Sequence, residues 1–261
     1  MKTTMKKRAP SPLSYALVVS ALCLATAFPA HAETGEKKTP VPSAREICPA
    51  NAVFQSRVDE KLNSLSLEDL TAASNQGNTD ATVLLGMRYT SGDLQNFEKA
   101  VSLFQAAADK GNADGEYYMA VAYLNGFGVP KDEAQAAVWF KRAADREHAV
   151  AQYWFGELTA KGRGGLTADW NAALPYFKKA ATGAVTDAFL EIGIMYHYGF
   201  GSLPVDYEES AICYRVASKL GSQVAQYNLG RMIHDGKVKW RPGDPTPRKG
   251  STPDVSVESA K

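Results

Sequence analysis

A glycine that recurs with nearly constant spacing is the feature that most constrains this chain. Gly92, Gly126, Gly162, Gly199 and Gly236 follow one another at intervals of 34, 36, 37 and 37 residues. A period of this length is typical of architectures in which one small structural unit is stacked many times. This spacing therefore predicts a repeat protein, and we interpret each local motif as part of a repeat.

Each of these glycines closes the same pattern, A-x-x-x-L-G-x-x-Y-x-x-G. Small residues recur at two of its positions. The first position holds Ala81, Gly115, Ala151, Ala188 and Ala225, and the sixth holds Gly86, Ala120, Gly156, Gly193 and Gly230. These small residues allow a second helix to approach closely, and the Leu-type and Tyr-type positions share one helical face with the first position. The closing glycine predicts a left-handed helix C-cap.

A second helix is predicted after each glycine. Asp132, Asp169 and Asp206 precede new apolar runs as natural N-caps. Each run carries a bulky pair and then a small pair. The pairs are Leu103-Phe104 with Ala107-Ala108, Trp139-Phe140 with Ala143-Ala144, Tyr176-Phe177 with Ala180-Ala181, and Cys213-Tyr214 with Ala217-Ser218. Neighbouring pairs of antiparallel helices would stack and bury each other's faces.

The second helices end in three copies at a glycine and in one at other residues. Gly111, Gly183 and Gly221 are the predicted ends, and the second copy has Arg146-Glu147 instead. Pro175 falls inside the third copy, where we expect it to kink or restart the helix.

The combined pattern, G-x-G-V-x-x-D followed by A-x-x-W-Y-x-x-A-A-x-x-G, resembles the Sel-1-like repeat, a relative of the tetratricopeptide repeat. The best copy runs from Gly126 to Asp132 and continues to Trp139–Ala144. The resemblance covers residues 78–236, about four and a half units. It implies an all-α fold, a right-handed α-solenoid of stacked antiparallel helix pairs that binds proteins and is not an enzyme.

The first 32 residues have the features of a secretory signal peptide. Four basic residues (Lys2, Lys6, Lys7 and Arg8) precede an apolar stretch that ends at Pro29-Ala30-His31-Ala32, which fits a signal-peptidase site. We expect cleavage after Ala32 and a periplasmic protein without a membrane span. The alternatives are an uncleaved anchor helix and a lipid on Cys23, which Leu22 before it disfavours.

The flanks of the repeat region differ in composition. Residues 33–45 are polar and predict a linker, and residues 46–77 predict an N-terminal helical cap. In the cap, Ser66 starts a helix whose Leu65, Leu67, Leu70 and Ala73 cover the first unit. The fifth unit has only its first helix, Gln223–His234, and residues 237–261 predict a disordered tail.

Charge and cysteine content exclude several classes of function. Without the signal the chain has 25 basic and 28 acidic residues, which disfavours nucleic acid and anionic lipid as partners. We expect Cys213 to be a buried thiol. We expect Cys48, several units away along a linear stack, to be free or to bridge two chains, because an intramolecular bridge needs Cα atoms within about 7 Å.

We find no pattern that predicts catalysis or a cofactor. His197 and His234 lie 37 residues apart, at equivalent places of adjacent units, and we expect neither to bind a metal. The glycine turns follow helices rather than strands, so they are structural turns and not phosphate loops. We expect no metal and no cofactor.

The candidate binding surface is the row of residues that helical spacing points away from the core on the first helices. In related solenoids these helices line the concave side. The predicted partner-binding residues are Tyr117, Val121, Tyr153, Glu157, Leu190, Ile194, His197, Tyr227 and Arg231. Aromatic residues and arginine are typical of interface centres. For the tyrosines, the alternative is that they pack between units. For Val121, Leu124 and Ile194, we favour a role in the interface.

Three classes of function stay open. The first is a periplasmic module that binds a protein or peptide, either an immunity protein that neutralises a secreted type VI effector or an envelope regulator or scaffold. The second is a β-lactam-type hydrolase, a class whose members in this family carry a cysteine pair in each repeat. The third is a self-assembling envelope protein. The choice within the first class depends on family analogy.

Overall fold

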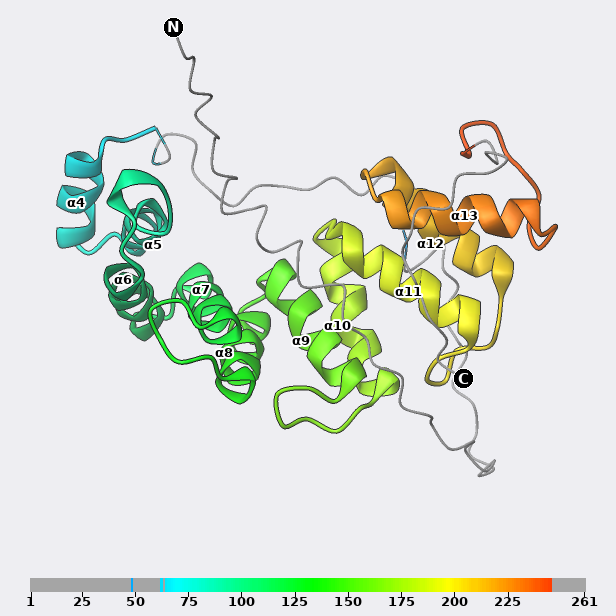
Figure 1. Ribbon diagram of the computed structural model, residues 1–261, viewed down its shortest axis with the longest axis horizontal. Helices are drawn as coiled ribbons and strands as arrows, with labels where there is room; N and C mark the ends of the chain where they lie inside the picture. The colour runs from blue at the N-terminus through cyan, green and yellow to red at the C-terminus, as the bar shows by residue number, and fades with distance from the viewer. Residues whose placement is uncertain (1–47, 49–61, 63, 246–261) are drawn as a thin grey trace, which may run out of the picture.

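The computed structural model describes residues 48, 62 and 64–245. Over this part of the chain all regular structure is helical, and the helices follow one another along an arc (Figure 1). They are α4 (Leu67–Asn75), α5 (Thr79–Arg88), the 3₁₀ turn η2 (Gly92–Leu94), α6 (Phe97–Asp109), α7 (Ala113–Asn125), α8 (Glu133–Asp145), α9 (Ala149–Lys161), α10 (Trp170–Thr182), α11 (Thr186–Tyr198), α12 (Tyr207–Lys219) and α13 (Gln223–His234). The predicted signal peptide, the linker and most of the 46–61 segment lie outside the described residues.

The helices pair as the repeat predicts. α5 with α6, α7 with α8, α9 with α10 and α11 with α12 form four units, and α13 is the first helix of a fifth. In Figure 1, α7 lies toward the inside of the arc and α8 toward the outside. We call the side of the stack on which the first helices lie its inner face, and the sequence places the candidate binding surface there.

The predicted helix caps are confirmed. The side chains of Asp132, Asp169 and Asp206 accept hydrogen bonds from backbone N–H groups in the first turns of α8, α10 and α12. At the other ends, α7, α9 and α11 stop at glycines with left-handed backbone, at φ 76°, 65° and 72°. The capping aspartates and glycines thus determine where these helices begin and end.

The second helices end at the predicted residues, but in two copies the left-handed residue after the helix is not a glycine. Gly183 has φ −82°, and the left-handed position that Gly111 and Gly221 occupy in their units falls on Ala184, at φ 55°. In the second unit it falls on Glu147, at φ 63°. Gly183 therefore ends α10 as predicted, and the left-handed residue comes one position later, where the repeat register and not the residue type places it.

The predicted restart at Pro175 is also wrong, because α10 is continuous from Trp170 to Thr182. Pro175 is exposed, so the helix loses one internal hydrogen bond on the side that faces water. Its neighbours Ala173, Leu174 and Phe177 are buried, and their packing holds the turn in helical form.

Aromatic side chains of the second helices pack against small residues of the first helices. A β-carbon at Gly86, Gly156 or Gly193 would lie 2.6, 2.9 or 2.6 Å from the ring of Phe104, Phe177 or Tyr214, respectively. The three aromatic residues are at most 3% exposed. The small residues are therefore required for each pair of helices to close.

The N-terminal end of the stack is covered by α4. The Ser66 side chain accepts a hydrogen bond from the Asp69 N–H and starts this helix. Leu70 is fully buried against Ala81, Leu84 and Leu85 of α5. Leu65, Leu67 and Ala73 pack around the same cluster and are partly buried.

The segment that follows α13 packs on the stack, so the prediction of a disordered tail from Lys237 is wrong for residues 237–245. Val238 is 5% exposed in the main hydrophobic cluster. Asp244 pairs with Arg215 of α12 at 2.8 Å, and its side chain is 4% exposed. Lys237 lies 4.4 Å from the centre of the Tyr207 ring. This segment has no apolar periodicity, because single anchoring residues and not a helix face make these contacts. Residues 246–261 lie outside the described part of the chain.

The close packing of Gly193 predicts a site-specific cost. Gly193→Ala should lower the free energy of unfolding by about 1–3 kcal/mol, because its β-carbon would overlap the buried Tyr214 ring. Gly230→Ala is the matched control: it holds the same repeat position, no atom lies within 4 Å of its added β-carbon, and helix propensity should stabilise it by up to about 1 kcal/mol. Urea unfolding measures both. Equal effects at the two positions would contradict this account of the packing.

The packing of residues 237–245 predicts that a chain ending at Gly236 is less stable than one ending at Pro245. The shorter chain loses Val238 and leaves Arg215 without Asp244, which should cost about 2 kcal/mol or more. Trp240→Ala is the control, since Trp240 is 50% exposed and its loss should change stability by about 0.5 kcal/mol or less. Identical thermal melting of the two chain lengths would show that the segment contributes nothing.

Candidate functional site

The tyrosines of the candidate surface pack between units. Tyr117 stacks on His148 with ring centroids 4.6 Å apart and approaches Phe140 at 5.9 Å. Tyr153 is 7% exposed, lies against Trp154 and Phe177 of its own unit, and interacts electrostatically with Asp187 and Glu191 of the next unit. The structure therefore favours the packing alternative for both residues, because the curvature of the stack brings each first helix against the next unit.

His148 shows how the turn between units is fixed. Its Nδ1 accepts the Ala151 N–H at 3.0 Å and so caps α9, and its Nε2 lies 3.0 Å from an oxygen of Asp114. Because Nδ1 accepts, the ring proton lies on Nε2 and is donated to Asp114. His148 is 8% exposed and has a structural role in positioning α9 against α7.

Glu157 is buried, contrary to the prediction that its position faces solvent. The residue is 6% exposed. Its Oε1 pairs with Lys161 one turn later on α9, and its Oε2 is buried without a hydrogen-bond partner. Two acidic residues of α11, Asp187 and Glu191, interact electrostatically with it. We call Glu157, Asp187 and Glu191 the acidic cluster.

The protonation of the acidic cluster follows from its surroundings. Burial, and then the negative charge of Glu157, raise the pKa of Glu191 to about 8, against a smaller opposing effect of Lys161. Burial and Glu157 also raise the pKa of Asp187. The pKa of Tyr153 is raised by burial and by the nearby carboxylates of Glu191, Glu157 and Asp187. The site therefore brings three carboxyl groups near one cation, Lys161, and Glu191 is largely protonated near neutral pH.

The apolar residues of the candidate surface are partly buried. Val121, Leu190 and Ile194 pack against the hydrophobic clusters and keep some exposure. Leu124, which the sequence also assigned to the interface, is 5% exposed and belongs to the core. Hence the inner face is open at fewer positions than helical spacing predicts.

The C-terminal part of the surface forms a small pocket between α11 and α13. Its lining residues are His197, Tyr198, Tyr214, Asn228, Arg231, Met232, Asp235 and Lys237. The Nδ1 of His197 is buried without a hydrogen-bond partner. Partial burial, and then Lys237 and Arg231, lower the pKa of His197, so its neutral form is favoured. Arg231 is exposed and lies over the ring of Tyr227 at 6.0 Å.

The described residues contain no group of three or more His, Cys, Asp or Glu side chains placed to hold a metal ion. His197 contacts the rings of Tyr198, Tyr207 and Tyr214, whereas the Nδ1 of His234 lies 3.0 Å from Asp235. The two histidines thus have different surroundings although they hold equivalent repeat positions.

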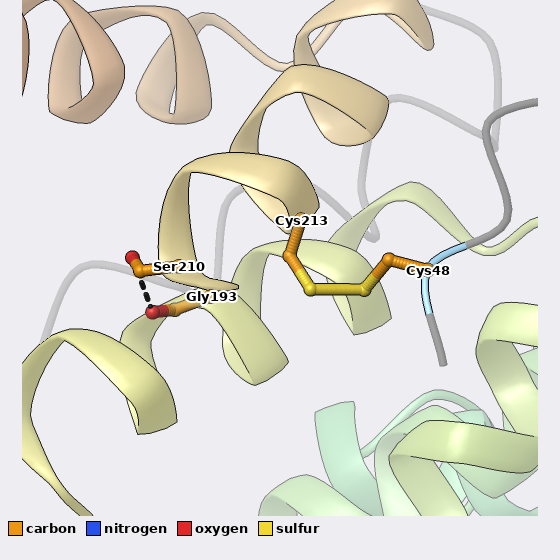
Figure 2. The surroundings of a disulfide bond; sticks show 4 residues. All are labelled: Cys48, Gly193, Ser210 and Cys213. Carbon is orange, nitrogen blue, oxygen red and sulfur yellow. Dashed lines mark hydrogen bonds between the residues drawn. A yellow bond between two sulfur atoms is a disulfide. The ribbon is translucent and has the colours of Figure 1, made fainter. Parts of the chain in front are cut away.

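Cys48 and Cys213 form a disulfide, and the prediction that they do not is wrong (Figure 2). Their Cα atoms are 5.4 Å apart, and both residues are at most 1% exposed. The prediction assumed that Cys48, which precedes the first unit in the sequence, also lies far from the fourth unit in space. Leu62, which packs near α5, comes 14 residues after Cys48, and a chain of this length can span up to about 50 Å. The segment before the first unit can therefore reach the fourth.

Sequence reasoning missed the acidic residues of α11. Asp187 and Glu191 lie four residues apart, so they share one helical face, and this spacing was a usable signal. Their proximity to Glu157 on α9 was not visible, because it depends on how far adjacent first helices rotate past one another.

The geometry defines a class of protein, an all-α solenoid of stacked helix pairs. Its described residues include no group of side chains placed to hold a metal ion. Among the described residues, no helix is both long enough and apolar enough to cross a membrane. The Sel1 repeat family matches residues 79–112, 113–148, 149–184, 188–222 and 223–246. The chain belongs to the Sel1 repeat family.

Proteins similar to this chain include regulators and one component of a larger assembly. Chitin synthase regulator SKT5 of Saccharomyces cerevisiae is 33% identical over 176 residues, which cover 64% of this chain and 25% of the relative. A component of an ERAD-associated E3 ubiquitin-protein ligase, HRD3 of Candida glabrata, is 39% identical over 69 residues, 26% of this chain and 8% of the relative. The chain thus spans a quarter or less of these two relatives.

A Sel1 repeat protein from Oxalobacter formigenes has a similar solved structure, with a TM-score of 0.59 and 28% sequence identity. The similarity covers 65% of this chain and 49% of that one. The repeat fold is therefore shared with a bacterial protein.

Proposed function

We propose that this protein is an exported binding module that holds a protein or peptide on the inner face of its solenoid. The observation that carries the proposal is the combination of partly exposed apolar residues with incompletely paired buried polar groups on that face. Val121, Leu190 and Ile194 are the apolar residues, and Glu157 and His197 supply the polar groups. Interface centres use this mixture of apolar contact and a few placed polar groups.

The named roles of the relatives support a binding function. One is a regulator of chitin synthase and the other a component of a ubiquitin-protein ligase, so both act with other proteins. By analogy, we infer that this chain acts as a regulator or adaptor rather than as an enzyme. The analogy concerns the repeat, since the chain spans only a small part of each relative.

Within this class we propose an immunity protein that neutralises a type VI secretion effector in the periplasm. An exported solenoid with partly open positions on its inner face would suit a protein that covers the surface of another. An envelope regulator or scaffold is the second candidate, favoured by the regulatory roles of the relatives. A β-lactam-type hydrolase fits less well, since the described disulfide joins the N-terminal segment to α12 and does not recur in each repeat.

The disulfide supports the proposed compartment. Structural disulfides persist in oxidising environments such as the periplasm and are rare in reducing ones. The buried Cys48–Cys213 bond and the signal-like first 32 residues are independent observations that both point to export. We therefore retain the periplasm as the proposed location.

Export with cleavage predicts a specific mass. The protein recovered from the periplasm should begin at Glu33 and resist thiol alkylation at Cys48 and Cys213 until it is reduced. Intact-mass measurement before and after reduction and alkylation checks both points. A mass that includes residues 1–32, or alkylation without reduction, would contradict the proposal.

The proposed surface predicts variants that lose the partner and keep the fold. Ile194→Ala with Arg231→Ala should abolish capture of the partner in a periplasmic pull-down, because truncating interface anchors commonly costs about 2 kcal/mol or more. If the protein is an immunity protein, the variant should also stop protecting cells that express the effector in the periplasm.

The matched control is Val138→Ala with Lys219→Ala, on exposed positions of the second helices α8 and α12. It removes one apolar side chain and one positive charge from the outer side of the stack and should leave binding unchanged. Thermal melting of both variants must stay close to that of the unchanged protein. Equal binding by the inner-face variant and the control would place the interface elsewhere.

A further inference from the structure

We propose that the acidic cluster of Glu157, Asp187 and Glu191 is a receptor for a lysine or arginine side chain of the partner protein. This inference rests on the proposed function and names the chemistry of the partner at one point of the inner face. Glu157 forms the buried base of the receptor, and the partly exposed residues of α11 form its rim.

The first observation is the unpaired oxygen of Glu157. This side chain is 8% exposed, and its Oε2 is buried with no hydrogen-bond partner, although its other oxygen pairs with Lys161. A buried carboxylate oxygen without a donor is costly, so its retention calls for an explanation such as a ligand. A cationic side chain donates N–H groups and would supply the missing bond.

Another buried carboxylate of the same fold shows how this protein satisfies such a group itself. Glu116 of α7 is 0% exposed, and its oxygens accept hydrogen bonds from Arg142 of α8 at 3.2 Å and from Arg146, which follows α8, at 3.1 Å. Glu157 faces two further acids instead of two arginines, with Lys161 as its ion-pair partner. The acidic cluster therefore has one cation for three carboxyl groups, whereas Glu116 has two arginines to itself.

The surroundings favour a basic side chain over a metal ion. The described residues hold no group of acidic or other ligands arranged for a metal. On α11, Leu190 and Ile194 flank Glu191 and are partly buried apolar residues. The aliphatic stem of lysine or arginine packs on apolar surface of this kind while its charged end reaches a carboxylate.

Binding of a cation would be linked to the release of a proton. Glu191 is faced by Glu157, Lys161 and Tyr153 of α9, by Asp187 of its own helix and by Tyr214 of α12. Its pKa is raised by burial and by Glu157, so near neutral pH the residue is largely protonated. A bound cation favours the ionised form. The affinity for a basic peptide should therefore rise with pH until Glu191 is ionised in the free protein.

The test uses a synthetic array of short random peptides probed with the unchanged protein. Peptides containing lysine or arginine should be enriched among the binders. Glu157→Gln with Glu191→Gln keeps the shapes of the side chains and should weaken the selected basic peptides by at least about tenfold. The control, Glu68→Gln with Glu98→Gln, removes the same charge from exposed positions on α4 and α6 and should leave binding unchanged. Between about pH 6 and about pH 8, the affinity of the unchanged protein for a selected basic peptide should rise, whereas that of Glu191→Gln should stay constant.

The outcomes separate this inference from the proposed function. Enrichment of peptides without basic residues, bound equally by both double variants, would overturn the receptor and leave the binding function standing. Equal loss in the acidic-cluster variant and in the control would show a general charge effect and also overturn it. A folded protein that selects no peptide would contradict both proposals. If the double variant melts at a lower temperature, the single variant Glu191→Gln replaces it in the test. An affinity of this single variant that still rises with pH, as in the unchanged protein, would overturn the receptor.

Discussion

The close approach of small residues on the first helices to aromatic residues on the second helices is the interaction on which the structure depends. At Gly193 a single β-carbon would come within 2.6 Å of the Tyr214 ring, so no larger residue fits without movement. The contact recurs at Gly86 and Gly156 with the rings of Phe104 and Phe177. Because it sets the distance within each helix pair, it also sets how units stack and curve.

The stacking decides which inner-face residues a partner can reach. Tyr153 and Glu157 occupy positions that helical spacing points away from their own unit, yet the next unit covers them. Val121, Leu190 and Ile194 hold comparable positions and stay partly exposed. The proposed interaction surface is thus a set of separate, partly exposed positions and not a continuous row along the helices.

The same stacking concentrates unequal charge on the inner face. Three carboxyl groups of α9 and α11 interact electrostatically, and Arg231, Lys237 and His197 line the pocket between α11 and α13. Acidic and basic groups on successive units give the face a direction, which favours one orientation of a bound chain over its reverse. The disulfide fixes Cys48 to the fourth unit, close to this part of the stack.

The sequence by itself determined the units of this protein. The spacing of Gly126, Gly162 and Gly199, with Asp132, Asp169 and Asp206 as N-caps, predicts helix pairs, their order and most of their boundaries, because caps and helical periodicity act over a few residues. Only the tertiary structure decided the Cys48–Cys213 bond, the docking of Val238 and Asp244, and the meeting of Glu157 with Asp187 and Glu191. These contacts join parts of the chain that no local period relates, and they depend on the curvature that builds up as the units stack.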